Sequence, residues 1–156
     1  MAAKIAYFDC FSGASGDMLL GALLDSGLDL ADLEKDVALL GLSGYRLRAS
    51  RQVRRVISGT KFDVVDEAHE RPGRHLSAIR EIVQGSGLPH EVVDDSLRVF
   101  RRLAEAEANI HGTSVEEVHF HEVGAVDALV DIVGFCAAIH RLGIEALYAS
   151  SLPLGR

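Results

Sequence analysis

The sequence lacks the features that mark several large classes of protein. It holds only two cysteines, Cys10 and Cys136, which form neither a disulfide framework nor a CxxC metal-binding pattern. Lysine and arginine number 16 against 23 acidic residues, and the net charge of −7 argues against nucleic acid or an anionic membrane as a partner. No apolar run approaches the roughly 20 residues of a membrane span. The N-terminal MAAKIAYFDC lacks the longer apolar stretch of a signal peptide, so we expect a reduced, cytoplasmic protein.

What remains has the composition of an ordinary globular domain. The 156 residues are 48% hydrophobic and 25% charged, which suffices for one domain with a core. Strand-like runs occur at 4–10, 45–50, 54–65 and 146–150, with Gly59 marking a bulge or turn. Helical patterns occur at 18–27, 30–40, 76–84, 90–111 and 125–141, with a short helical turn at 113–116. This order predicts an α+β or α/β fold, a single compact domain over 1–156 in which a small sheet packs with about five to six helices.

Two aspartates interrupt the most apolar of these helices. Apolar residues cover most of the circumference of 125–141, which is typical of a buried helix. Asp127 and Asp131 are four residues apart and therefore share one face. Buried carboxylates are costly unless they are paired, hydrogen-bonded or bound to a metal. No lysine or arginine occurs between Arg102 and Arg141, so a distant arginine or a metal ion must supply the charge. A purely structural role as a first-turn residue explains Asp127 well and Asp131 poorly.

A histidine pair directly precedes this helix, in the segment VHFHE. His119 and His121 point the same way if the segment is extended. Neutral imidazole is a common ligand of zinc, nickel, copper and iron, and carboxylates complete such sites, so Glu122 is a candidate ligand or base. The HExxH signature is absent because Ala125 stands where the second histidine would be. The alternative is a histidine pair that belongs to the polar surface.

A second candidate site lies in the turn YFDCFSGASGD at 7–17. Asp9 falls at the end of a predicted strand, and the turn leads to a helix N-terminus whose free N–H groups can hold an anion. The turn matches neither the Walker loop nor the nucleophile elbow. Asp9 and Asp17 would repel a bare phosphate, so an anion bridged by a metal fits better. Asp17 has a structural alternative as a first-turn carboxylate, and Cys10 fits a small buried hydrophobe better than a soft ligand.

Two weaker features complete the candidates. A cluster of basic residues is a candidate for contact with a substrate phosphate, although a solvated strand face is the simpler interpretation; its members are Arg46, Arg48, Arg51, Arg54, Arg55 and Lys61. His69 and His75 flank the loop DEAHERPGRH, which suits a polar surface or a lid that delivers a metal.

The long motifs together resemble a known family. YFDCFSGASGDMLLGALLDSG, VHFHEVGAVDALVDIVG and the final LPLGR closely resemble the LarC family of nickel insertion proteins, and the resemblance covers essentially the whole chain. It implies a lyase-class cyclometallase that inserts nickel into pyridinium-3,5-bisthiocarboxylic acid mononucleotide, using CTP with manganese or magnesium, to make the nickel-pincer cofactor of lactate racemase. Family members are much longer, and their CTP binding is associated with the C-terminal part. The chain therefore resembles the N-terminal domain alone, which leaves open whether it catalyses anything by itself.

The resemblance also suggests roles for individual residues. His119, His121 and Glu122 would hold or hand over nickel, with Asp127 and Asp131 as ligating or neighbouring carboxylates. His75 matches a regular histidine of the family, whereas the reduced histidine content of the loop makes nickel storage there a weak expectation. Asp9, Asp17 and Glu122 are the candidate catalytic residues, and the turn formed by Ser12, Gly13, Ser15 and Gly16 would take the anionic group of the substrate.

Two other functions compete with nickel insertion. Histidine–carboxylate clusters also support metal-activated water, which suits a metal-dependent phosphoester hydrolase. The motifs would instead form core and interface if the chain were a non-catalytic module that assembles with the C-terminal part or with a second copy of itself.

Overall fold

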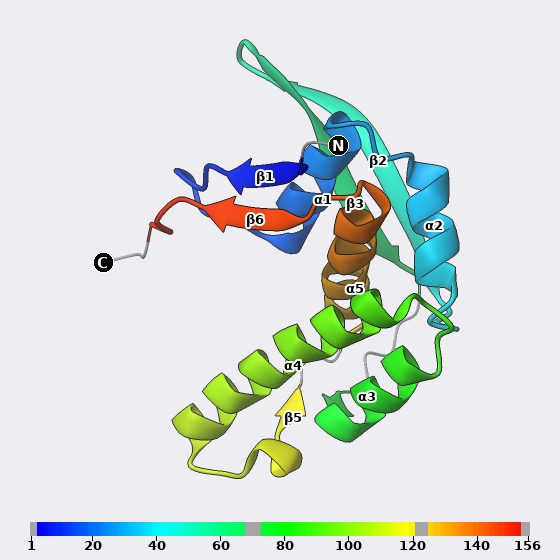
Figure 1. Ribbon diagram of the computed structural model, residues 1–156, viewed down its shortest axis with the longest axis vertical. Coiled ribbons are helices and arrows are strands. Elements are labelled where there is room, and N and C mark those ends of the chain that lie inside the picture. The colour runs from blue at the N-terminus through cyan, green and yellow to red at the C-terminus, as the bar shows by residue number, and fades with distance from the viewer. Residues whose placement is uncertain (1–2, 68–72, 121–124, 154–156) are drawn as a thin grey trace.

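A single helix, α5, lies at the centre of the molecule (Figure 1). The computed structural model describes residues 3–67, 73–120 and 125–153. The contacts of α5 (Val126–Arg141) are with three helices and a strand: α1 (Gly16–Asp25), α2 (Leu30–Ala38), α4 (His90–His111) and β3 (Ile57–Asp66). These neighbours surround α5, and this explains why its sequence is apolar on most sides. No helix in the described part of the chain is long and apolar enough to cross a bilayer.

The remaining elements complete an α+β fold, which confirms the predicted class. They are β1 (Ile5–Phe8), β2 (Tyr45–Arg54), β4 (Arg74–His75), α3 (Leu76–Gln84), the 3₁₀ turn η1 (Val115–Glu117), β5 (His119–Phe120) and β6 (Ala146–Ala149). Within the described residues the strands form three two-stranded sheets. β1 pairs with β6 in parallel, whereas the pairs β2–β3 and β4–β5 are antiparallel.

The hairpin β2–β3 corrects one expectation about its turn. Gly59 does not form a bulge or a turn, because it lies within the ladder opposite Gln52. The chain reverses instead at Arg55 and Val56, where Arg55 adopts a left-handed backbone with φ of 58°. An arginine gives no sequence signal for such a conformation, which glycine and asparagine favour.

Helix ends follow local chemistry and match the sequence closely. The Asp29 side chain caps α2 by accepting a hydrogen bond of 2.7 Å from the Ala31 N–H. Gly112 ends α4 with φ of 64°, the left-handed conformation that glycine adopts easily. The short helical turn expected at 113–116 lies at Val115–Glu117 instead, and a capping box begins it, since Glu117 Oε2 accepts hydrogen bonds from the N–H and hydroxyl of Ser114 at 3.3 and 2.8 Å.

Two glycines allow helices to pack closely around the core. A Cβ atom on Gly21 of α1 would overlap the backbone carbonyl of Thr60 in β3, so only glycine permits this approach. A Cβ on Gly134 of α5 would lie 3.4 and 3.5 Å from side-chain atoms of Leu33 and Val37 in α2. The first contact places α1 against β3, and the second lies between α5 and α2.

Candidate functional site

The N-terminus of α1 lies directly against Asp131 of α5. A Cβ atom on Gly16 would overlap the Asp131 side chain, including its Cβ, so the absence of a side chain at Gly16 is what admits the carboxylate. This contact brings the two candidate motifs together, although they are separated by more than 100 residues of sequence. The sequence singled out Gly16 for an anion-binding turn and gave no signal that it would face Asp131.

The surroundings of Asp131 disfavour the negative charge of its carboxylate. Its Oδ1 atom is buried and has no hydrogen-bond partner. Burial, followed by the negative charges of Asp17 and Asp127, raises the pKa of Asp131 from 3.8 to about 6. Both charged neighbours that raise this pKa are acidic, so each adds to the cost of ionising Asp131.

The other two carboxylates lie where the sequence placed them. Asp127 is exposed in the first turn of α5, and Asp17 is half-buried in the first turn of α1. The Ser15 hydroxyl donates a hydrogen bond to Asp17 instead of capping α1 with its side chain. An anion bound at this helix end would therefore meet Asp17 and Asp131, which disfavours a bare phosphate.

A second group consists of two histidines on neighbouring strands. His75 of β4 pairs with His119 of β5, and their rings meet edge to face with centroids 4.7 Å apart. Both residues are exposed. Gly73 makes room for this arrangement, because a Cβ atom there would overlap the His119 ring. Two predicted metal ligands, 44 positions apart in sequence, are thus in contact.

The backbone fixes the tautomer of His75. Its Nδ1 lies 3.1 Å from the carbonyl oxygen of Val118. A carbonyl only accepts hydrogen bonds, so Nδ1 carries the proton and, in the neutral ring, Nε2 keeps its lone pair. Histidines that bind metals commonly donate their other N–H to a carbonyl in this way. Sequence reasoning missed the contact with the Val118 carbonyl, since it depends on strand pairing.

The structure does not assemble a complete metal site from the residues it describes. His121 and Glu122 lie outside the described residues, as does His69. Within residues 3–67, 73–120 and 125–153, no three histidine, cysteine, aspartate or glutamate side chains form a group that could hold a metal ion. The metal site therefore stays a prediction.

The rest of the predicted turn lies at the surface. Asp9 and Ser12 are exposed, and Gly13 turns the chain with φ of 90° and an N–H that donates to the Cys10 carbonyl at 2.9 Å. The side chain of Cys10 is buried, as is that of Cys136, which agrees with the interpretation of Cys10 as a small hydrophobe.

The basic cluster forms ion pairs on the hairpin β2–β3. Arg48 and Lys61 both contact Asp63, the former at 3.1 Å, and Arg51 contacts Asp25 at 2.6 Å. The hydrogen bonds and charges of Lys61 and Arg48 lower the pKa of Asp63, so this carboxylate remains ionised beside them. Much of the positive charge is thus neutralised within the hairpin, which favours the solvated-face interpretation.

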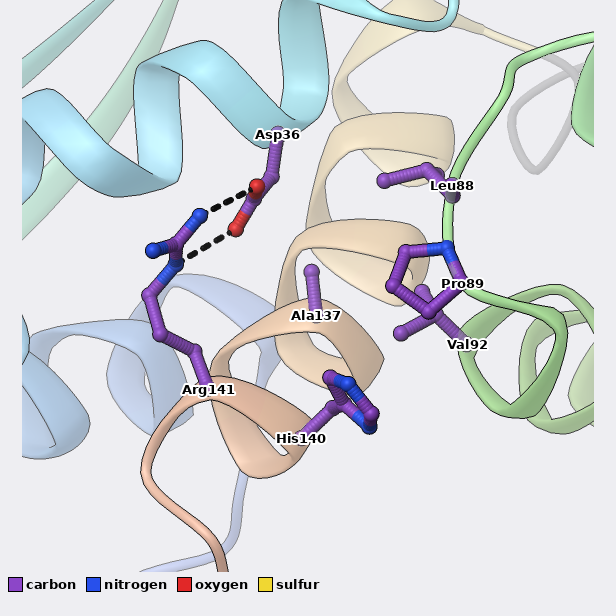
Figure 2. A pocket seen from close by; sticks show the side chains of 7 residues that line it. All are labelled: Asp36, Leu88, Pro89, Val92, Ala137, His140 and Arg141. Atoms are coloured by element: carbon purple, nitrogen blue, oxygen red, sulfur yellow. Dashed lines mark hydrogen bonds and ion pairs between the residues drawn. The ribbon is translucent and has the colours of Figure 1, made fainter.

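A separate hollow of about 370 Å³ lies at the C-terminal end of α5 (Figure 2). Its lining includes Pro89, Val92 and His140, and at its rim Arg141 donates hydrogen bonds of 2.8 and 2.6 Å to the two carboxylate oxygens of Asp36. The hydrogen bond to Asp36 raises the pKa of Arg141. Because this arginine is already paired, the hollow offers an anion little charge, and we assign the pair to the connection between α2 and α5.

Comparison with known proteins identifies the family. The model of the nickel insertion protein family matches residues 6–156, so the chain belongs to that family. The pyridinium-3,5-bisthiocarboxylic acid mononucleotide nickel insertion protein of Desulfitobacterium hafniense strain DCB-2 is 52% identical over 154 residues. A protein of Geobacter sp. strain M21, provisionally named as a nickel insertion protein, is 50% identical over 153 residues. No solved structure matches the chain.

The matched region is nearly all of this chain but less than half of each relative. It takes in 98% of this chain but only 38% of the Desulfitobacterium protein and 40% of the Geobacter protein. The chain thus spans about two fifths of the length of these relatives.

Proposed function

We propose that this chain is the N-terminal, metal-handling domain of a protein that inserts nickel into pyridinium-3,5-bisthiocarboxylic acid mononucleotide. The observation that carries the proposal is the family match over residues 6–156, together with the substrate named for the Desulfitobacterium relative. Nickel is the cargo of this reaction. The chain's task is to hold the ion and present it to the substrate.

The histidine pair supports a nickel-holding role. His75 and His119 are in ring contact, and the proton on Nδ1 of His75 leaves its Nε2 free to ligate. Nitrogen ligands suit nickel, although they also accept other first-row metals. We assign His121 and Glu122, which follow β5 directly in sequence, as the further ligands, with Glu122 also a candidate base.

The carboxylates support a role in handling charge. Asp17, Asp127 and Asp131 gather negative charge at the α1 N-terminus, where a cation would relieve the orphaned Oδ1 of Asp131. We propose that the turn from Ser12 to Gly16 takes the substrate's anionic group only when a metal lies between it and these carboxylates. Asp9 and Asp17 are the proposed catalytic carboxylates at this edge.

We assign the CTP of the proposed reaction, with its manganese or magnesium, to the part of the relatives that this chain does not cover. The acidic turn beside α1 would repel a triphosphate, and the sequence lacks a Walker loop. The described residues therefore offer no favourable cradle for the nucleotide.

Calorimetric titration of this chain with nickel tests the proposal. We expect binding near one equivalent, and a loss of at least tenfold in affinity for the double variant His75→Ala/His119→Ala. The matched control is His90→Ala/His111→Ala, which removes two exposed histidines that pair with Glu91 and Glu107 at opposite ends of α4. Circular dichroism establishes that each variant is folded.

The outcomes separate the competing functions. Absence of nickel binding by the folded wild-type chain would exclude a nickel-holding role. Equal losses in both double variants would assign the affinity to scattered surface histidines. Turnover of a generic phosphoester by the metal-loaded chain alone would favour the hydrolase, because an insertion domain has no reason to activate water.

A further inference from the structure

The sheet formed by β1 and β6 is smaller and more exposed than parallel sheets usually are. Among the described residues, β1 and β6 pair only with each other. Parallel strands occur almost only in sheets that are covered on both faces, because the helices that connect such strands pack on those faces. A pair of parallel strands at the edge of the molecule (Figure 1) is therefore an unusual arrangement.

One face of this sheet is apolar and open to solvent. Tyr7 of β1 lies opposite Tyr148 of β6, and paired residues of parallel strands point to the same face. Tyr7 is 64% exposed, Tyr148 is 57% exposed, and Ile5 on the same face is 61% exposed. Contiguous exposed apolar patches commonly mark interaction sites.

The opposite face is covered only beneath β1. Phe8 packs against Phe135 of α5 with ring centroids 5.8 Å apart. On β6, Leu147 points to this same side and is still 47% exposed. β6 is thus exposed to solvent on both faces, which leaves room for further elements to pack on it.

An open groove runs beside β1. It has a volume of about 380 Å³ and is lined by β1 itself, by Ala22 of α1, by Ser26 directly after α1, and by Ile144 before β6. A β-strand presents alternate side chains to each face and free N–H and C=O groups at its edge, so an added strand finds both a pocket and hydrogen bonds.

We propose that strands from the part of the nickel insertion polypeptide outside this match extend the β1–β6 sheet and cover its Tyr7–Tyr148 face. The relatives argue for this occupant, because about 60% of each lies outside the match while the matched part is 50–52% identical. A segment in the same polypeptide has a high effective concentration, which stabilises edge pairing that would be weak between separate molecules. A second copy of this chain has no such advantage.

Cysteine labelling tests whether the face is covered in a full-length relative. Tyr148→Cys in this chain should react rapidly with a maleimide, as should the matched control Val56→Cys on the hairpin tip, where Val56 is 95% exposed. The native Cys10 and Cys136 are buried and give a low background. In the full-length Desulfitobacterium protein, cysteine at the position aligned with Tyr148 should react at least tenfold more slowly than at the position aligned with Val56.

Each outcome decides the proposal. Equal rates at the two positions of the folded full-length relative would overturn it. Slow labelling of Tyr148→Cys in this chain alone, with a dimer mass by light scattering that Tyr148→Lys abolishes, would also overturn it and identify a second copy as the occupant. Fast labelling here and slow labelling in the full-length relative would support it, whether or not this chain binds nickel.

Discussion

The two ends of α5 differ in whether their charged side chains have partners. At the C-terminal end, Arg141 and Asp36 satisfy each other through two hydrogen bonds. At the N-terminal end, Asp131 keeps a buried oxygen without a partner, and the charges that raise its pKa are those of Asp17 and Asp127. A fold tolerates such a cost mainly where function needs it, so the comparison makes the N-terminal end of α5 the candidate for function and the C-terminal end a structural contact.

The largest effect should come from closing the space that admits Asp131. Gly16→Ala places a Cβ on the Asp131 side chain, and because the overlap includes the Asp131 Cβ, rotation of the carboxylate cannot relieve it. We expect a loss of about 1–3 kcal/mol in the free energy of unfolding, measured with urea at pH 7 in EDTA.

Gly59→Ala is the matched control for that substitution. A Cβ on Gly59 would meet only Asp25 Oδ2 at 3.8 Å, an ordinary contact. We expect its effect to stay within about 0.5 kcal/mol. If the two alanine variants were equally stable, the close contact between α1 and Asp131 would not exist in solution.

A smaller effect, of opposite sign, should follow from removing the charge of Asp131. Asp131→Asn should stabilise the metal-free protein at pH 7 by about 1–2 kcal/mol after allowance for solvent screening. The folded-state pKa of about 6 lies above the ordinary 3.8, so the folded wild type binds this proton more tightly than the unfolded chain does. Its stabilisation by protonation is fully present below about pH 4 and is lost as the pH rises through 6.

The measurement is the difference between wild type and Asp131→Asn in chemical unfolding from pH 4 to pH 8. We expect this difference to grow between pH 4 and 6 and to stay constant above that range. A difference that does not change with pH would show that Asp131 titrates normally and that the N-terminal end of α5 carries no unusual cost.

The smallest effect should come from the ion pair at the C-terminal end of α5. Arg141→Ala should lower the free energy of unfolding by about 1 kcal/mol or less, because the pair is partly exposed. The control is Lys35→Ala. The Lys35 side chain pairs with Asp32 and is 72% exposed, so we expect almost no change in the free energy of unfolding. The loss in Arg141→Ala should shrink in 1 M salt; a loss that salt leaves unchanged would point to packing instead of charge.

The fold was predictable wherever local chemistry decides it. The α+β class, the glycine that ends α4 and a short helical turn before β5 follow from spacing and backbone preference, although the turn lies at Val115–Glu117 and not at 113–116 as expected. The hairpin turn at Arg55 did not follow, because tertiary pairing imposes its left-handed backbone. The pairing of β1 with β6 was equally invisible, since nothing near either strand selects its partner.

The candidate site was predictable in its parts and not in its assembly. Periodicity placed Asp131 on a buried helix, where a carboxylate is costly, and in the structure its Oδ1 is buried without a hydrogen-bond partner. The contact of His75 with His119 needed strand pairing across 44 residues, and the contact of Gly16 with Asp131 needed helix packing. Long-range geometry of this kind leaves no trace in a single sequence, whereas residue type alone marks the candidates.

The parallel pairing of β1 with β6 has a consequence for synthesis on the ribosome. β1 emerges first, yet its only partner among the described strands lies about 140 residues later, so the pair can close only after those residues have been made. The hairpin β2–β3, by contrast, joins neighbouring segments and can form early. We expect the N-terminal strand, with Ile5 and Tyr7, to stay unpaired until then, which exposes its apolar side chains to aggregation or to a chaperone during that time.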